Sequence, residues 1–139
     1  MFATLAFARF FPDGRRLVWS NAGQNPPILL RGDGTIELLQ PSGPAVGIVS
    51  GARWRDASRR FEAGDALILY TDGVVEARDG ERRPYGVERL IAAARRGVGS
   101  AGLTRETILE DLARHTGDVP HRDDVTLVVV RGVPLPEAP

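Results

Sequence analysis

The chain has 139 residues, 42% of them hydrophobic and 26% charged, which suits one soluble globular domain and excludes wholesale disorder. Its 18 basic and 18 acidic residues give zero net charge, so no global field attracts nucleic acid or an anionic membrane. All the basic residues are arginine and cysteine is absent, which excludes lysine Schiff bases, a P-loop lysine, thiolate nucleophiles, disulfides and zinc knuckles.

Neither a membrane-spanning segment nor a signal peptide is predicted. No apolar run approaches the roughly 18 to 20 residues needed to cross a bilayer, and the first residues lack a basic start followed by an apolar block. We therefore expect a cytoplasmic protein, with neither nucleic acid nor a membrane as partner.

The first half of the chain predicts a β-meander. Strands are expected at Met1–Phe11 and Arg16–Asn21 around a Pro-Asp-Gly turn, and a second hairpin is expected to join Pro27–Arg31 to Thr35–Leu39. Residues 40–51, rich in Gly, Pro and Ser, predict a long surface loop.

The second half predicts further strands and two helices. A strand is expected near Arg53–Phe61, and the apolar run of Asp65–Thr71 is typical of a central strand buried on both faces. Apolar residues recur at helical spacing in Gly86–Arg96. A second helix is expected to begin near Thr104, with that residue as its N-cap.

The last strand is predicted at Val125–Arg131, again buried, and is followed by a frayed tail. We expect one domain over residues 1–132 and a flexible tail over 133–139. The chain opens directly into a strand, which suggests that a segment is absent upstream.

Carboxylates stand at the ends of two of the predicted buried strands. The first strand leads into Asp72-Gly73, and Asp123-Asp124 leads into the last strand. If these strands are antiparallel, three carboxylates converge at one edge of the sheet. Clustered carboxylates repel one another unless a cation neutralises them, and Mg²⁺ or Mn²⁺ prefers oxygen ligands. The alternative is that both motifs are ordinary turns, in which Asp-Gly and a strand-capping Asp are common.

Several ordered segments resemble the SpoIIE-type branch of the PPM (type 2C) metal-dependent protein phosphatases. The matching segments are MFATL (1–5), NAGQNPP (21–27), GPAVGI (43–48), GDALILYTDGVVEAR (64–78), YGVERL (85–90) and DDVTLVVVR (123–131). The resemblance covers almost the whole chain, and the TDG and DDVT matches are its most specific parts.

This resemblance implies an α+β fold, an αββα sandwich of antiparallel sheets that holds a binuclear Mn²⁺ or Mg²⁺ site at one end. Asp72 and Asp123 would be metal ligands, and Gly73 and Asp124 would be neighbours that shape the site. In such a site a metal-activated water attacks phosphorus, so no protein nucleophile is needed. The implied substrate is a phosphoserine or phosphothreonine protein of partner-switching signalling, a STAS-type anti-sigma-factor antagonist of bacterial sigma-factor and stress-response regulation.

The sequence departs from the family pattern in two respects. Gln24 stands where a histidine usually follows the Asn-Ala-Gly segment. The family's upstream aspartate and its aspartate-containing motif before a Gly-His-Gly turn have no counterpart, so we expect an incomplete metal site and an N-terminal part of the domain to be missing.

Other polar residues have two interpretations each. Glu76 follows the metal turn and either supports a switching segment or is simply exposed, whereas Arg82, Arg83 and Tyr85 could form a flap that meets a phosphoprotein. His115 and His121 are more typical of solvated or capping histidines than of ligands. The four Arg-Arg pairs are scattered, which favours solvated surface.

Three hypotheses remain open at this point. The first is a Mn²⁺- or Mg²⁺-dependent protein phosphatase, of which this chain is the C-terminal portion. The second is a truncated, non-catalytic phosphatase-like scaffold, and the third is a β-rich domain whose carboxylates only cap turns. A homodimer formed through an edge strand left bare by the missing segment is also possible.

Overall fold

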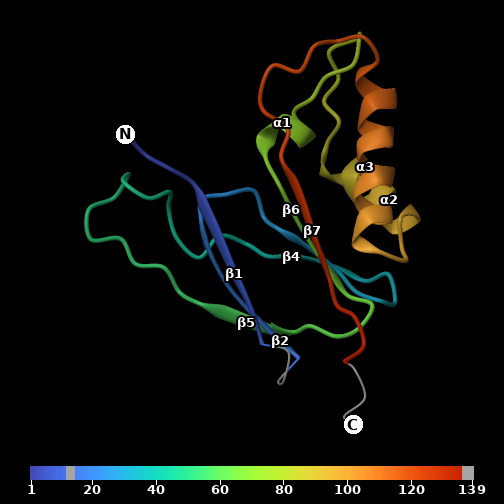
Figure 1. Cartoon of the computed structure of the whole chain (residues 1–139). Coiled ribbons are helices and arrows are strands. Elements are labelled where there is room, and N and C mark those ends of the chain that lie inside the picture. Colours follow the sequence, from blue (N-terminus) through green and yellow to red (C-terminus); the bar gives the residue numbers. More distant parts are fainter. Residues whose placement is uncertain (12–14, 136–139) are drawn as a thin grey trace. The chain divides into compact units, whose positions relative to one another are not determined.

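A computed structural model describes residues 1–11 and 15–135 of the chain, so the predicted Pro-Asp-Gly turn at 12–14 and most of the tail lie outside the described residues. The described residues form two compact units, residues 1–65 with 132 onward, and residues 66–131. Figure 1 labels the helices and strands of both units, and each unit is described separately below. None of the helices in the described ranges is long and apolar enough to cross a membrane.

The first unit is made of antiparallel strands joined by turns and loops. Strands β1 (Leu5–Phe11), β2 (Arg16–Ala22) and β5 (Ala57–Arg60) form a sheet in the order β1-β2-β5. Strands β3 (Ile28–Leu30) and β4 (Ile36–Leu38) form a short antiparallel hairpin that is not part of this sheet. Both expected hairpins, β1–β2 and β3–β4, are confirmed. The expected meander is not, because β2 pairs with β5 and not with β3. Strand β5 is also shorter than predicted, since residues 53–56 have no ladder partner among the described residues.

A buried carboxylate ties the loops of the first unit together. Asp65 accepts hydrogen bonds from the guanidinium of Arg31 at 2.9 Å and from the backbone amides of Gly32 and Glu62 at 3.1 and 3.0 Å. Because its oxygens are fully engaged, this aspartate is a structural group that offsets its own burial cost.

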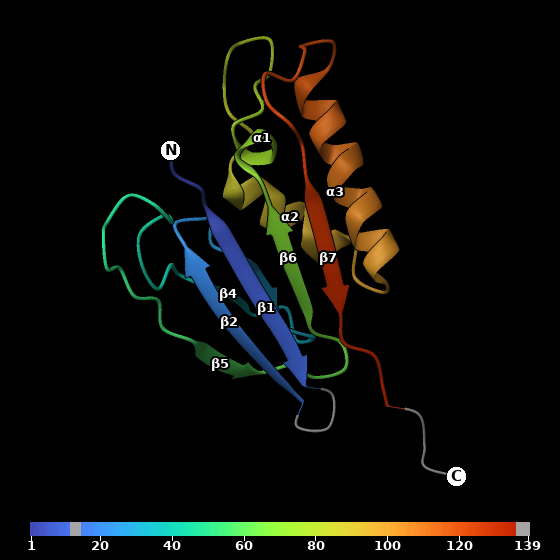
Figure 2. The same ribbon diagram turned by 60° about the vertical axis from the view of Figure 1, so that its left-hand side comes forward.

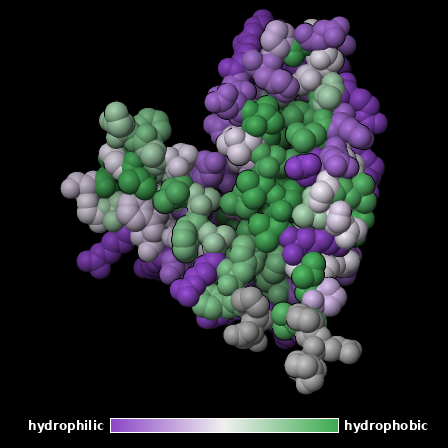
Figure 3. Space-filling view, viewed as in Figure 1, coloured by the Kyte–Doolittle hydropathy of each residue, from purple (hydrophilic) through white to green (hydrophobic). Residues whose placement is uncertain are grey.

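Hydrophobic side chains are exposed near the start of the first unit. Leu5 and Phe7 on β1 are 57% and 56% exposed, and Phe2 and Ile48 are also exposed. The segment around Phe2 lies beside the 45–48 loop because Ala3 and Val46 form a β-bridge. Figure 3 shows this apolar surface in green on the left of the view. Strand β1 is therefore an edge strand with an apolar, solvent-facing side.

The second unit contains an antiparallel pair of strands with helices on one face (Figure 2). Strands β6 (Ala66–Tyr70) and β7 (Leu127–Arg131) pair antiparallel, with Leu67 opposite Val130 and Tyr70 opposite Leu127. Between them the chain forms α1 (Asp72–Val75), α2 (Val87–Arg96) and α3 (Ala101–Thr116). Figures 1 and 2 show α2 and α3 packed together along the β6–β7 ribbon.

The helices follow the apolar periodicity of their sequences. Helix α2 buries Leu90, Ala93 and Ala94, and α3 buries Ile108 and Leu112, so each helix presents an apolar stripe to the unit's core. The N-cap of α3 was predicted four residues too late: it is Ser100, whose hydroxyl accepts a hydrogen bond from the Leu103 amide.

The last strand is less buried than its composition predicts. Strand β6 is almost completely buried, as expected, but Val128 in β7 is 47% exposed and the other residues of β7 are half-buried. An apolar run of valines fits a half-covered strand as well as a fully covered one, so burial on both faces did not follow from composition.

Candidate functional site

The two predicted carboxylate motifs meet at one end of the antiparallel β6–β7 pair. Because the strands are antiparallel, the end of β6 and the approach to β7 lie at the same edge. The Thr71 hydroxyl donates a hydrogen bond to the Asp124 carbonyl at 2.9 Å and accepts one from the Thr126 amide at 3.0 Å. The Thr71 amide also donates to the Thr126 carbonyl. Thr71 therefore fastens the TDG segment to the DDVT segment.

Gly73 permits a close approach between these segments. A Cβ atom at this position would lie 2.3 Å from the Asp124 carbonyl oxygen and 3.1 Å from that of Asp123. Since real Cβ atoms do not come so close to backbone oxygens, only glycine fits here without a shift. The glycine is required by packing against the second motif.

The carboxylates themselves stand at the surface of this junction. Asp72 is exposed at the first position of α1, directly after the extended N-cap Thr71. Asp123 is also exposed, and its Oδ1 accepts a hydrogen bond from the Asp124 amide at 2.8 Å, which fixes the orientation of this carboxylate. Asp124 contributes its backbone carbonyl to the contacts with Thr71 and Gly73.

These carboxylates do not form a complete metal site. Within residues 1–11 and 15–135 there is no group of three or more His, Asp or Glu side chains that could hold an ion. The predicted convergence of three carboxylates is therefore wrong, because Asp124 takes part through its backbone and not through a third clustered side chain. The donors that remain, Asp72 and Asp123, are oxygen ligands of the kind that Mn²⁺ and Mg²⁺ prefer, and they fit part of a site.

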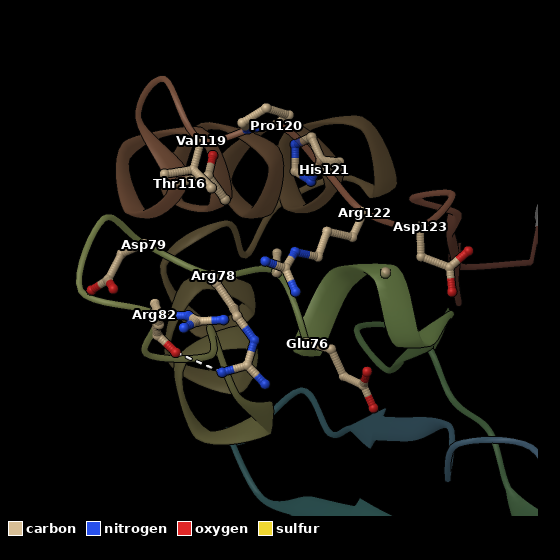
Figure 4. Close-up of a pocket in the computed structure, with 12 residues that line it drawn as sticks. Glu76, Arg78, Asp79, Arg82, Thr116, Val119, Pro120, His121, Arg122 and Asp123 are labelled. Carbon is tan, nitrogen blue, oxygen red and sulfur yellow. Dashed lines mark hydrogen bonds between the residues drawn. The ribbon is translucent and has the colours of Figure 1, made fainter.

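A pocket of about 210 Å³ opens beside this junction. It is lined at one end by Gly73, Asp123 and Glu76, and elsewhere by arginines that come from two loops. Figure 4 shows the guanidinium groups of Arg78, Arg82 and Arg122 directed toward the middle of the pocket. Glu76 follows α1 as its C-cap, and its exposed side chain borders the pocket.

The predicted flap is a short hairpin that follows α1. Its turn is closed by Asp79, whose Oδ1 accepts hydrogen bonds from the amides of Glu81 and Arg83 and whose Oδ2 accepts one from the Arg83 Nε at 2.7 Å. Burial would raise the pKa of Asp79, but the hydrogen bonds and the charge of Arg83 outweigh this and hold it below its ordinary value. Arg82 has a left-handed backbone (φ 66°) and lines the pocket, whereas Arg83 is paired to Asp79 and Glu81.

Tyr85 is buried and connects the flap to the helices. It is 3% exposed, and its hydroxyl donates to Asp111 at 3.0 Å. Burial, and then the hydrogen bond and negative charge of Asp111, raise the pKa of Tyr85 far above its ordinary value of 10.0, so the phenol stays protonated. In this conformation Tyr85 positions the flap and has no surface on which a substrate can bind.

Asp111 is the centre of a polar cluster that sequence reasoning missed. This buried carboxylate accepts hydrogen bonds from Arg89 and Arg96 at 2.8 and 2.7 Å and a longer one from Arg114. Burial would raise its pKa, but the bonds from Arg89 and Tyr85 and the arginine charges hold the pKa below 3.8. A single Asp on the apolar side of α3, with one arginine three residues along the helix and others in α2, was the available signal.

The two histidines have different surroundings. His115 Nδ1 accepts a hydrogen bond from Arg89, which has only donors, so its Nε2 carries the hydrogen and donates to the Arg83 carbonyl at 3.0 Å. His115 therefore joins helix α2 to the flap. His121 is exposed at the pocket's edge.

Gln24, which stands where the family usually has histidine, lies in the first unit. Its side-chain oxygen accepts a hydrogen bond from the Thr4 hydroxyl at 2.7 Å. Its backbone amide donates to the side chain of the buried Asn21, and its backbone carbonyl accepts from that side chain.

Comparison with known proteins identifies the family. The family described as Stage II sporulation protein E (SpoIIE) matches residues 1–132. The chain belongs to the SpoIIE family. This confirms the resemblance carried by the TDG and DDVT motifs.

Two individual relatives are moderately similar in sequence. The chain is 31% identical over 130 residues to Protein IcfG of Synechocystis sp. and 28% identical over 134 residues to the phosphoserine phosphatase RsbU of Bacillus subtilis. Each match covers 94% of this chain but only 20% of IcfG and 39% of RsbU. The chain thus spans well under half the length of either relative.

Solved structures of SpoIIE-type and PP2C phosphatase domains share the fold. The RsbU and RsbW domains of Rv1364c from Mycobacterium tuberculosis align with a TM-score of 0.76 at 26% identity, over 96% of this chain and 38% of that one. The Mn-presoaked phosphatase domain of SpoIIE from B. subtilis aligns with a TM-score of 0.70 at 22% identity, over 97% of this chain and 59% of that one. The expected α+β fold with antiparallel sheets is confirmed.

Proposed function

We propose that this chain is the C-terminal portion of a Mn²⁺- or Mg²⁺-dependent protein phosphatase, with the phosphatase domain over residues 1–132. Its substrate would be phosphoserine or phosphothreonine on a signalling protein of the STAS type, an anti-sigma-factor antagonist. The observation that carries the proposal is the junction at which Gly73 packs on the Asp123–Asp124 backbone, with Asp72 and Asp123 exposed beside it. Membership of the SpoIIE family and the similarity to the phosphoserine phosphatase RsbU support it.

Each residue at the proposed metal site would have a distinct role. Asp72 and Asp123 would bind the ions, Gly73 would let the two motifs close around them, and the Asp124 amide would orient the Asp123 carboxylate. The chemistry supplied by bound Mn²⁺ or Mg²⁺ is polarisation of the phosphoryl group and activation of water for attack on phosphorus. Glu76 would support the metal turn from the end of α1.

The flap would meet the protein substrate. Arg82 lines the pocket directly, and Arg83 holds the hairpin through its ion pair with Asp79. Tyr85 would contribute by anchoring the flap to Asp111. A cytoplasmic location and a role in bacterial sigma-factor or stress-response signalling are part of the same proposal.

A second candidate is a phosphatase-like scaffold that binds a partner without catalysis. It is favoured by the small number of ligands, since the described residues contain no group of three or more metal-binding side chains. Affinity for a divalent ion falls steeply as carboxylates are lost, so this chain alone would hold ions weakly. A turn-capping role alone for the carboxylates predicts no metal effect on stability at all.

Thermal melting with and without Mn²⁺ tests the proposal. At ten times the dissociation constant, a bound ion stabilises the folded state by about 1.4 kcal/mol. We expect the chain to melt higher in millimolar Mn²⁺ and the Asp72→Ala/Asp123→Ala variant to lose this response. Asp118→Ala, which removes an exposed carboxylate of the same unit, is the control and should keep it.

Hydrolysis of a small phosphate ester, followed in the same samples, separates the two candidates. Mn²⁺-dependent hydrolysis that the double variant loses supports the enzyme. A metal-dependent melting shift without hydrolysis favours the scaffold. The absence of any Mn²⁺ response contradicts metal binding by these aspartates.

We also propose that the chain forms a homodimer through β1. The edge position of this strand and the exposure of Leu5 and Phe7 support the proposal, because an apolar edge strand can pair with a second copy.

A further inference from the structure

Three guanidinium groups converge beside the candidate metal ligands without a carboxylate of the protein among them. Arg78 and Arg82 come from the flap, and Arg122 precedes Asp123 in the loop after α3. Figure 4 shows their guanidinium groups facing the same space, while the carboxylates of Glu76 and Asp79 lie toward its edges. Within the described ranges, none of these arginines has a carboxylate partner within 4.0 Å.

The local structure holds this arrangement in place. The Arg78 guanidinium donates a hydrogen bond to the Arg82 carbonyl at 2.6 Å. The backbones of Arg78 and Pro84 form an antiparallel β-bridge across the flap. The Asp79 carboxylate at the turn is occupied by Arg83 and by two backbone amides, so it is not available to neutralise its neighbours. The pocket therefore keeps three like charges close together, which an anionic ligand would relieve.

We propose that Arg78, Arg82 and Arg122 form a subsite for an acidic side chain that flanks the phosphorylated residue of a protein substrate. This inference rests on the proposed function, since it takes the reacting phosphoryl group to lie at Asp72 and Asp123. Arg122 is the immediate neighbour of Asp123, so the subsite adjoins the metal ligands without including them. The recognised side chain would therefore lie close to the phosphoserine along the peptide.

Arginine suits this task because its planar guanidinium binds a carboxylate with two parallel hydrogen bonds, and arginine clusters are a common means of recognising acidic motifs. The pocket is open to solvent, as Arg78, Arg82 and Arg122 are all exposed. The subsite would therefore contribute selectivity between substrates more than overall affinity, because exposed ion pairs are individually weak.

The test compares two fluorescent phosphoserine peptides that differ only in their flanking residues, Asp and Glu in one and Asn and Gln in the other. Fluorescence anisotropy in Mn²⁺ at low salt measures their binding to the 139-residue chain, and mass spectrometry of the same samples establishes that the peptides remain phosphorylated. We expect the acidic peptide to bind about fivefold more tightly. The Arg122→Gln/Arg82→Asn variant should reduce this preference to less than about twofold. Asn is chosen at position 82 because it tolerates the left-handed backbone found there.

Arg105→Gln is the matched control, since Arg105 is exposed on α3 outside the pocket. It should keep the wild-type preference, and melting curves should establish that all variants are folded. Equal binding of both peptides to the wild-type chain would overturn the inference, as would an equal loss in the Arg105 control. Failure of the proposed function appears elsewhere, as the lack of Mn²⁺-dependent hydrolysis of a small ester that has no flanking residues.

Discussion

Replacing Gly73 with alanine tests whether the two motifs must touch. The new methyl group would lie 2.3 Å from the Asp124 carbonyl oxygen and 2.8 Å from its carbonyl carbon, so backbone would have to move. Both atoms belong to a segment that Thr71 holds by hydrogen bonds. Overpacking of this kind costs about 1–3 kcal/mol. For a chain of this size that corresponds to a fall in Tm of roughly 3–12 °C.

The assay is thermal unfolding followed by circular dichroism, with Gly80→Ala as control. A Cβ at Gly80 would meet nothing within 4 Å, and its φ lies outside the left-handed region, so this variant should melt within about 1 °C of the parent chain. If Gly73→Ala melted as the Gly80 variant does, the close packing of TDG on DDVT would be refuted. If it melted lower but kept the full Mn²⁺ response, packing at Gly73 would be unnecessary for metal binding.

Three further changes follow from described contacts. Asp111→Asn should lower the free energy of unfolding by about 2 kcal/mol at pH 7, as measured by urea unfolding. The loss should be smaller than for a fully buried ion pair, because Arg89 and Arg96 are about half-exposed. Folding lowers the pKa of the Asp111 carboxyl below 3.8, so its contribution to stability is present above that pH and should be lost as the pH falls further. If the Asn variant lost stability with acid in the same way as the parent chain, this assignment would be contradicted. Ser100→Ala should cost about 1 kcal/mol by removing the α3 cap, with Ser58→Ala as an exposed comparison. Leu5→Thr/Phe7→Thr should reduce any concentration-dependent association seen by light scattering, and a dimer unaffected by it would place the interface elsewhere.

Strand positions could be predicted from the sequence because their apolar residues are bounded by Gly, Pro and Asp. The central strand β6 is the clearest example, since its buried run ends at Thr71 and the Asp-Gly motif. Helix α1 was missed because four residues are too few for helical periodicity. The start of α3 was misplaced because Thr104 is a favourable N-cap residue but lies inside the helix. There its hydroxyl hydrogen is shared between the carbonyls of Gly97 and Ser100, which precede the helix.

The candidate site was predictable only where a motif carried it. Asp72, Gly73 and Asp123 stand in segments whose order along the chain resembles a family, and strand pairing brings them to one edge. Of the pocket arginines, only Arg82 was among the residues predicted for a flap. The convergence of all three could not be found this way, because it depends on how the flap hairpin and the loop before β7 fold toward each other. The same holds for Asp111, whose partners come from three separate segments.

The boundaries of the second unit have an evolutionary consequence. Its two ends are neighbours, because Ala66 pairs with Arg131 in the β6–β7 ladder and the Gly132 amide donates to the Asp65 carbonyl at 2.8 Å. Residues 66–131 are thus encoded by one continuous stretch of the gene, and the first and last residues of this unit are neighbours in the structure. Exchange of this one stretch between related genes could transfer the Asp72-Gly73 turn, the flap and the pocket arginines together while leaving the rest of the chain unchanged. Under the proposed function, substrate preference would then be inherited with this single segment.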